Sequence, residues 1–405
     1  MTRRRLVLAW LRAPVIVQVL LVYAAARVFS AVVIAEVARF QAESVWTSAD
    51  PGYTGMLGIW DAVWYREIAE DGYPSSVPLG ADGRPQQSAL AFYPVFPLLA
   101  RALSAVTGLD FAVSGSVVAL VTGAGAAVLV HRVLHEAVLR AGGRPATARR
   151  AAWSAAVLFC VSPVSPVLQV AYTEGPAMLL LAGFLLLLLR RAYLPAAVLA
   201  LVLGLTRPVA LPLTAVVVVH LGLRALRAHR GGARRPPTGV AVRAAVLLAA
   251  SGTAGLLWPG ITWWLTGRRD AYTATMGAWR SSGEVVPFVP WVSVSQYLLG
   301  DLVGPVLLLL LLGLAAFFLL SARTAVLGLE LRVWCLAYSG YLLAVLDPFT
   351  SLFRYLMLLF PLGGLVALHP RRRGALRATV VACLLLQIVW TAWLWRFSPP
   401  ADWPP

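Results

Sequence analysis

The chain has 405 residues, of which 60% are hydrophobic and only 13% are charged, and its mean hydropathy is +0.78. This composition excludes a water-soluble globular protein, whose surface needs more charge, and indicates a polytopic membrane protein. The net charge of +17 could suggest a nucleic-acid partner, but the arginines cluster in short loops between apolar runs, as the positive-inside rule predicts, so we expect no nucleic-acid binding.

About eleven apolar runs are predicted to cross the bilayer as helices, which makes residues 1–405 one all-α integral membrane domain. A helix needs roughly 20 apolar residues to span the hydrocarbon core, and the shorter runs are near the lower limit. The first run is too long for a signal peptide and has no small-residue cleavage site. The predicted spans cover residues 14–37, 111–130, 153–170, 177–190, 194–205, 208–223, 240–265, 296–320, 333–346, 356–368 and 376–395.

Two long connections are predicted on the extracytoplasmic face, a large first loop at 38–110 and a second loop at 266–295. Within the first, residues 89–106 are apolar but interrupted by prolines, which favours a helix lying along the outer surface. The short runs 194–205 and 208–223 meet at Thr206-Arg207-Pro208. They form either a shallow hairpin with Arg207 at its outer apex or one helix broken by proline.

Charge is distributed unevenly between the two faces. Most of the 34 arginines fall in segments assigned to the cytoplasm, whereas of the 17 acids only Glu136 and Glu330 do so. We therefore expect a plasma-membrane protein with a cytoplasmic N-terminus and an extracytoplasmic active site. All five histidines fall on the cytoplasmic side: His131, His135, His220, His229 and His369. A base on the outer face must then be a carboxylate.

The stretch at 60–73 (Trp-Asp-Ala-Val-Trp-Tyr-Arg-Glu-Ile-Ala-Glu-Asp-Gly-Tyr) gathers acids and large aromatics in the first outer loop. At helical spacing Asp61 and Tyr65 share one row, and Trp60 and Trp64 share the next. The helix is predicted to stop at Gly72. This pattern frames one carboxylate with aromatic rings, although an interfacial helix without catalytic function would also carry Trp and Tyr.

Three further segments accompany this stretch in the same order along most of the chain. They are 91–98 (Ala-Phe-Tyr-Pro-Val-Phe-Pro-Leu), 162–174, in which Ser162-Pro163 leads to Tyr172-Thr173-Glu174, and 353–361, with Phe353-Arg354-Tyr355-Leu356 before Phe360-Pro361. Together the four segments resemble the PIG-V class of GPI mannosyltransferases and its bacterial relatives. The resemblance implies a GT-C-like fold and a polyprenyl- or dolichyl-phosphate sugar donor. Asp61 matches the acidic position of the family's first outer loop.

An inverting glycosyl transfer needs a base for the acceptor hydroxyl and positive charge for the departing phosphate. Asp61 is the candidate base, since neighbouring Trp60 and Trp64 would partly desolvate it and raise its pKa. Arg207 and Arg354 are the candidate phosphate ligands, because a guanidinium binds phosphate with two parallel hydrogen bonds. Alternatively, both could extend toward lipid headgroups.

The remaining candidates are residues that could bind substrate. The donor-phosphate candidates also include Arg268 and Arg269, and the substrate-binding candidates are Trp60, Trp64, Tyr65, Tyr172 and Glu174. No paired-aspartate motif occurs, and Cys160, Cys335 and Cys383 lie within apolar runs, so we expect no metal or other cofactor.

The acceptor could be a glycolipid, a polymer or a protein hydroxyl. Two other classes of protein also have many spans: a transporter or flippase of lipid-linked sugars, and a non-catalytic membrane subunit. A transporter should show repeated halves and ionisable residues near mid-span, whereas here no repeat is evident and the charges cluster at the outer ends.

Overall fold

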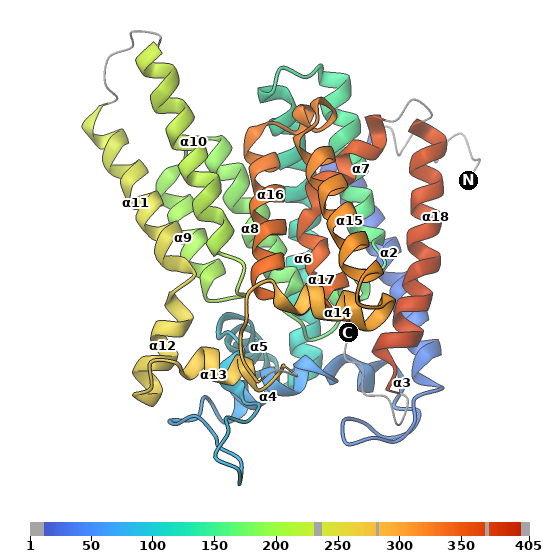
Figure 1. Ribbon diagram of the computed structural model, residues 1–405. Helices are drawn as coiled ribbons and strands as arrows, with labels where there is room; N and C mark the ends of the chain where they lie inside the picture. The colour runs from blue at the N-terminus through green and yellow to red at the C-terminus, as the bar shows by residue number, and fades with distance from the viewer. Residues whose placement is uncertain (1–11, 231–236, 281–282, 369–371, 398–405) are drawn as a thin grey trace, which may run out of the picture.

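The computed structural model describes residues 12–230, 237–280, 283–368 and 372–397. These residues form an all-helical fold in which the β pairing found is one isolated antiparallel bridge between Leu79 and Pro85. The main hydrophobic core extends from the first helix, α2 (Val15–Ala38), to Trp395. At its centre α6 (Phe111–Arg140) packs against both α7 (Pro145–Val161) and α8 (Glu174–Leu189) (Figure 1).

Five helices in the described part of the chain are long and apolar enough to cross a membrane, or six if one bent pair is a single span. The five are α2, α6, α10 (Leu211–Arg230), α15 (Val303–Leu320) and the C-terminal helix over Gly374–Trp395; the bent pair is α11 (Thr238–Ala254) with α12 (Leu257–Thr266). Shorter apolar helices are α5 (Val95–Thr107), α8, α9 (Tyr193–Gly204) and the segment Leu352–Leu368. The membrane character agrees with the prediction, but the count of about eleven spans is not confirmed.

Two predicted boundaries were wrong, each for an identifiable reason. α6 continues ten residues past position 130, because Val133, Leu134 and Ala137 bury one face of the added turns. Its first turn is capped by the Asp110 side chain, which accepts from the Val113 amide at 3.0 Å. α7 ends at Val161 instead of continuing to 170, because Pro163 has no amide N–H with which to continue the hydrogen bonds of the helix. A short 3-10 helix, η3 (Ser165–Gln169), follows.

Breaks also divide the later predicted spans. The run at 240–265 becomes α11 and α12, which are bent by 54°. Gly300, at φ +87°, separates α14 (Val289–Leu299) from α15. α16 (Leu329–Val345) is followed by α17 (Leu352–Leu356) and a 3-10 segment, η5 (Met357–Leu368). The last helix, α18 (Arg372–Trp390), ends in a π-helical turn over Thr391–Trp395.

The segment at 192–223 is a hairpin of two helices rather than one broken helix. The Tyr193 hydroxyl, at the start of α9, lies 3.3 Å from His220 Nε2 in the middle of α10. It also accepts from Arg224 Nη1 at 3.0 Å, so the two helices run in opposite directions. Arg207 consequently lies in the turn between them, at the end where the Leu205 carbonyl accepts from the Val95 amide of α5.

The helices of the two predicted outer loops gather at one end of the molecule (Figure 1). There α4 (Asp61–Glu70) and α5 lie near α13 (Ala271–Gly277), which follows α12, while α3 (Gly52–Gly55) packs against α2 on the other side of this end. The connection from α6 to α7, the end of α10 and the start of α11 lie at the opposite end, and the first two of these are rich in arginine. The acidic and basic segments of the sequence are thus separated along the helix axes.

Candidate active site

The site begins at an unusual backbone turn before α4. Trp60 has φ +60° and ψ −127°, a conformation that a bulky side chain rarely adopts. Its indole is only 5% exposed, and Nε1 donates to the Trp395 carbonyl at 3.0 Å. The ring also packs against Trp46 and Phe397. The buried indole anchors this turn, and Asp61 follows it as the first residue of α4.

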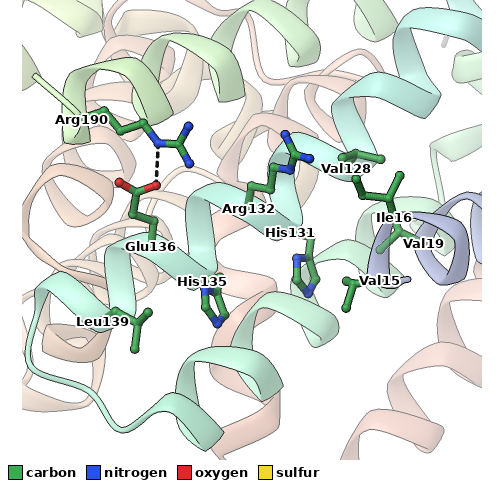
Figure 2. Close-up of a pocket in the computed structure, with 10 residues that line it drawn as sticks. All are labelled: Val15, Ile16, Val19, Val128, His131, Arg132, His135, Glu136, Leu139 and Arg190. Carbon is green, nitrogen blue, oxygen red and sulfur yellow. Dashed lines mark hydrogen bonds and ion pairs between the residues drawn. The ribbon is translucent and has the colours of Figure 1, made fainter. Parts of the chain in front are cut away.

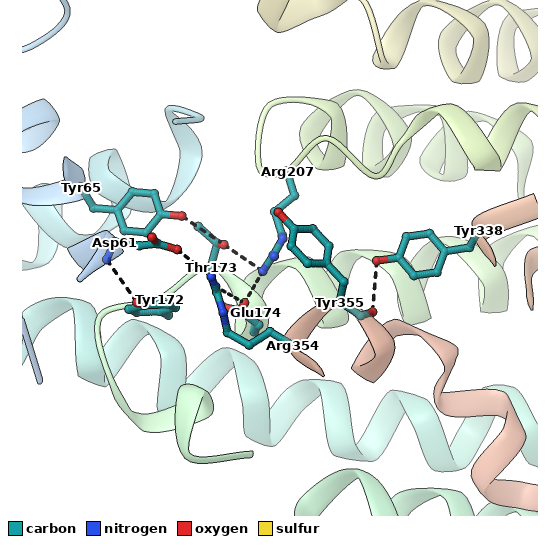
Figure 3. A network of polar contacts seen from close by, with 9 residues as sticks. All are labelled: Asp61, Tyr65, Tyr172, Thr173, Glu174, Arg207, Tyr338, Arg354 and Tyr355. Atoms are coloured by element: carbon teal, nitrogen blue, oxygen red, sulfur yellow. Dashed lines mark hydrogen bonds and ion pairs between the residues drawn. The ribbon is translucent and has the colours of Figure 1, made fainter. Parts of the chain in front are cut away.

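Asp61 lies at one end of an alternating row of carboxylates and guanidinium groups (Figure 3). Arg354 donates from Nη2 to Asp61 Oδ2 at 3.1 Å and from Nη1 to Glu174 Oε1 at 2.9 Å. Arg207 Nη1 lies 2.5 Å from the same Glu174 oxygen. We call these four residues the outer network. Its two formal positive and two formal negative charges balance, which is the condition for keeping such groups out of water.

Tyrosine and threonine side chains hold the outer network in place. The Tyr172 hydroxyl accepts from the Asp61 amide at 3.1 Å, and Arg354 Cζ lies 5.0 Å from the Tyr172 ring centre. Arg207 Nη1 donates to Thr173 Oγ1 at 3.3 Å, and that oxygen lies 3.4 Å from the Tyr65 hydroxyl. These contacts fix the orientation of both carboxylates and both guanidinium groups.

Exposure distinguishes Asp61 from the rest of the outer network. The side chain of Glu174 is fully buried, and those of Arg207 and Arg354 are 5% and 7% exposed, whereas Asp61 is 23% exposed. The two arginines therefore do not extend to lipid headgroups, as the alternative interpretation supposed. Asp61 is the carboxylate through which this network meets its surroundings.

The electrostatic state of Asp61 follows from its position. Burial raises the pKa of the Asp61 carboxyl above its ordinary value, while the positive charge of Arg354 opposes that rise. The sequence analysis attributed desolvation to Trp60 and Trp64. In the structure the Trp60 indole packs against Trp46 and Phe397 and donates to the Trp395 carbonyl.

Two of the predicted substrate-binding residues have covered side chains in this structure. Trp60 is buried against the C-terminal segment and cannot stack on a sugar. Glu174 is covered and contacts two arginines, so its position is that of a residue that orients them. Tyr65 and Tyr172 adjoin Asp61 within the site. Arg268 pairs with Asp270 on the surface and Arg269 covers Trp263, so neither joins the outer network.

An aromatic wall, formed by Trp64, Phe92 and Trp279, adjoins the site. Trp64 stacks on Phe92 with ring centres 5.7 Å apart and meets Trp279 edge-on at 5.4 Å. All three rings remain partly accessible. Trp279 was not predicted as a site residue because it follows Trp64 by more than 200 positions and has no local motif.

Tyr355 is a second residue that the sequence analysis did not assign to the site. Its ring lies under Arg207, with Cζ 4.7 Å from the ring centre. Its backbone carbonyl accepts from the Tyr338 hydroxyl at 3.1 Å. Tyr355 could have been suspected, since it directly follows Arg354. Among the described residues no group of three or more His, Cys, Asp or Glu is placed to hold a metal ion.

No protein-family model matches the chain, and no curated protein matches it. Two similar solved structures are crystal structures of the oligosaccharyltransferase of Archaeoglobus fulgidus. One is tethered by a disulfide to an acceptor peptide containing the NVT sequon; it has 14% identity and a TM-score of 0.47, and covers 91% of this chain and 55% of that one. The other is a complex with zinc and sulfate, with 16% identity, a TM-score of 0.37, and coverage of 92% and 48%. This chain spans about half the length of these structures.

Proposed function

We propose that the protein is a membrane glycosyltransferase of the GT-C type, with Asp61 as the general base. It moves a sugar from a polyprenyl-phosphate donor to an acceptor hydroxyl on the extracytoplasmic face, with inversion at the anomeric carbon. The observation that carries the proposal is the outer network, a balanced pair of carboxylates and pair of guanidinium groups at the acid-rich end of the fold. The resemblance to PIG-V mannosyltransferases favours mannose as the sugar.

Asp61 has the geometry that a base requires. Arg354 contacts Oδ2, and Oδ1 has no hydrogen-bond partner among the described residues, so it can accept the acceptor's proton. The side chain is partly exposed, which the other three members of the outer network are not. A carboxyl whose pKa is raised by burial is also a stronger base, which improves proton transfer from a weakly acidic hydroxyl.

The charge balance of the outer network suits the departure of a phosphate. The acceptor oxygen bonds to the anomeric carbon, its proton passes to Asp61, and the bond from that carbon to the phosphate oxygen breaks. Protonated Asp61 no longer neutralises Arg354, so the network acquires one net positive charge as the leaving phosphate acquires negative charge. Arg354 Nε is buried without a hydrogen-bond partner among the described residues and supplies a further donor.

Glu174 and the aromatic wall complete this assignment. Glu174 Oε1 holds Arg207 and Arg354 side by side, which counters the repulsion between two cations that face one phosphate. The rings of the aromatic wall offer flat apolar faces, against which a sugar ring can stack. The acceptor class, whether glycolipid, polymer or protein, is left to experiment.

The test is an assay of purified protein with polyprenyl-phosphate mannose and a panel of acceptors, followed by analysis of the linkage formed. Transfer from the lipid-linked donor, with inversion, supports the proposal. In parallel, proteoliposomes are assayed for movement of the same lipid across the bilayer without any acceptor. Movement across the bilayer with no sugar transfer to any acceptor would instead identify a flippase.

A further inference from the structure

A second charged site lies far from the outer network, at the arginine-rich end of α6. A cavity of about 520 Å³ opens between the end of α6, the start of α2 and Arg190 after α8 (Figure 2). Its lining includes Val15 and Val19 of α2, Val128, His131 and Arg132 of α6, and Arg190. This volume is within the range of small-molecule sites, and nothing in the proposed transferase reaction uses it.

The lining is divided into a polar part and an apolar part. Arg132, His131 and His135 lie along one side of α6, and the two imidazoles stack with ring centres 6.2 Å apart. Val15, Ile16 and Val19 of α2 form the facing apolar wall. A ligand that fills this cavity therefore needs both a polar head and an apolar portion.

The polar part carries a surplus of positive charge. Glu136 is already paired, since Arg140 Nη2 and Arg190 Nε each lie 2.8 Å from one of its oxygens. Arg132 is exposed and has no ion-pair partner in the part of the chain that the structure describes. The head of the ligand is therefore anionic, and the compact charge that guanidinium groups bind best is a phosphate.

The depth of the cavity in the bilayer identifies the class of ligand. Val15 is the first residue of α2, a helix long and apolar enough to span the membrane, so the cavity lies where the apolar span begins, at headgroup level. Val15 and Ile16 are 43% and 40% exposed and present an apolar surface toward the bilayer. Basic pockets between spanning helices bind anionic lipid headgroups through such an arrangement.

We propose that this cavity binds the headgroup and first acyl carbons of an anionic glycerophospholipid. The phosphate lies against Arg132 and the two histidines, and the chains leave along Ile16 and Val19. The site stands apart from the proposed transferase reaction and can be tested whether or not sugar transfer is observed.

The experiment measures lipid binding to the purified protein in detergent, by native mass spectrometry and by thermal stabilisation. Phosphatidylglycerol, phosphatidylcholine and inorganic phosphate are compared. We expect phosphatidylglycerol to bind and stabilise, with little effect from the other two. In Arg132→Gln its affinity should fall about fivefold, the effect of one basic residue near a lipid surface. The matched control is Arg149→Gln, an exposed arginine at the same end of the molecule but outside the cavity.

A second variant, Val128→Trp, fills the apolar side without changing charge and should weaken phosphatidylglycerol binding without creating a response to phosphate. Equal binding of phosphatidylglycerol and phosphatidylcholine would overturn the proposal. So would an equal loss in the two arginine variants, which would indicate general surface attraction. Stabilisation by inorganic phosphate as strong as that by phosphatidylglycerol would assign the cavity to a free anion and overturn the lipid part.

Discussion

Arg27 and Arg354 are both buried, but different partners neutralise them. Arg354, in the outer network, lies between the carboxylates of Asp61 and Glu174. Arg27, within α2, contacts neutral oxygens: Nη2 donates to the Cys160 carbonyl at 2.7 Å and to Ser165 Oγ at 2.8 Å, and Nη1 donates to the Ser165 carbonyl. No carboxylate forms an ion pair with Arg27 among the residues that the structure describes.

The environment of Arg27 explains this difference. The Cys160 and Ser165 carbonyls lie on either side of the break at Pro163, where the helical ladder leaves acceptors without their usual donors. Arg27 supplies those donors, and Gln387 extends the contact by donating to both Ser30 and Ser165. A guanidinium group among carbonyls stabilises a break in a helix. A guanidinium group among carboxylates becomes less neutralised when one of those carboxylates takes up a proton. The comparison therefore predicts structural effects at Arg27 and catalytic effects in the outer network.

The largest expected effect is on turnover in Asp61→Asn. The amide keeps the size of the side chain but cannot accept a proton, so sugar transfer should fall by about 10² to 10⁴, with folding and donor affinity nearly retained. Single-turnover rates and donor binding measured on the same preparation check this. Asp71→Asn, at an exposed position just after α4, is the control and should transfer normally. If Asp61→Asn transfers at the wild-type rate, Glu67 and Glu174 become the next candidates, and Asp71 joins them only if its own variant loses activity.

Arg27→Gln should act on stability instead. Its loss leaves buried carbonyls with fewer donors, which we expect to cost about 2 to 4 kcal/mol of unfolding free energy. Thermal unfolding in detergent provides the measurement, with Arg39→Gln, an exposed position at the end of the same helix, as control. Transfer activity per folded molecule should remain nearly unchanged. A large loss of turnover with unaltered stability would remove the distinction between the two buried arginines.

Arg354→Lys keeps the positive charge but removes the planar group that contacts two carboxylates at once. Donor affinity should weaken roughly tenfold, or about 1.4 kcal/mol. Arg354→Ala should weaken it further, while Arg268→Lys, outside the outer network, should bind normally. Unchanged donor affinity in the alanine variants of both Arg354 and Arg207 would limit these residues to orienting the carboxylates.

The pH profile should show a smaller but specific change. The base must be ionised, and burial raises the pKa of Asp61. As the pH is lowered, activity should therefore begin to fall at a higher pH than it would with an aspartate of ordinary pKa. Arg354 opposes that rise. Arg354→Gln should therefore move the acid limb of the residual activity to still higher pH, whereas Arg268→Gln should not. An acid limb that moves downward in Arg354→Gln would mean that another group titrates.

Single cysteine substitutions, which should leave activity unchanged, test which end of the molecule faces outward. We expect Asp82→Cys, on an exposed turn of the first outer loop, to react with a membrane-impermeant maleimide in intact cells. Arg149→Cys, at the opposite end, should react after permeabilisation alone. Both should retain full activity; the native Cys160 and Cys335 are buried, and the half-buried Cys383 is replaced by Ser in both variants. The reverse labelling pattern would place the outer network in the cytoplasm and contradict a lipid-linked donor on the outside.

The sequence indicated which polar residues to examine but not how they combine. Asp61, Glu174, Arg207 and Arg354 were recognisable because charged groups next to apolar runs are costly unless they are used. Their pairing could not be predicted, because more than 100 residues separate Asp61 from Glu174, and Glu174 from Arg354. The backbone of Trp60 has a positive φ, which a tryptophan rarely adopts, so its residue type would not have suggested this turn.

The helices show the same limits of prediction. Hydropathy located most of the apolar segments, because burial in lipid or core needs the same residues. It could not locate the 54° bend between α11 and α12, where the apolar composition continues across the break. The end of α7 was marked by Pro163, and the prediction carried the span past it by weighing apolar length over proline.

The contact between Trp60 and Trp395 has a consequence for biosynthesis. The Trp60 indole donates to the Trp395 carbonyl, and the Trp395 indole donates to the Met56 carbonyl, so the segment before α4 and the turn after α18 hold each other. These partners are 335 residues apart, which at roughly 5 to 20 residues per second corresponds to about 20 to 70 seconds of translation. During that interval α4 has neither the support of Trp395 nor, for most of it, the charge of Arg354. We therefore expect a ribosome-bound chain to show no transferase activity until α18 has inserted and Trp395 has reached α4.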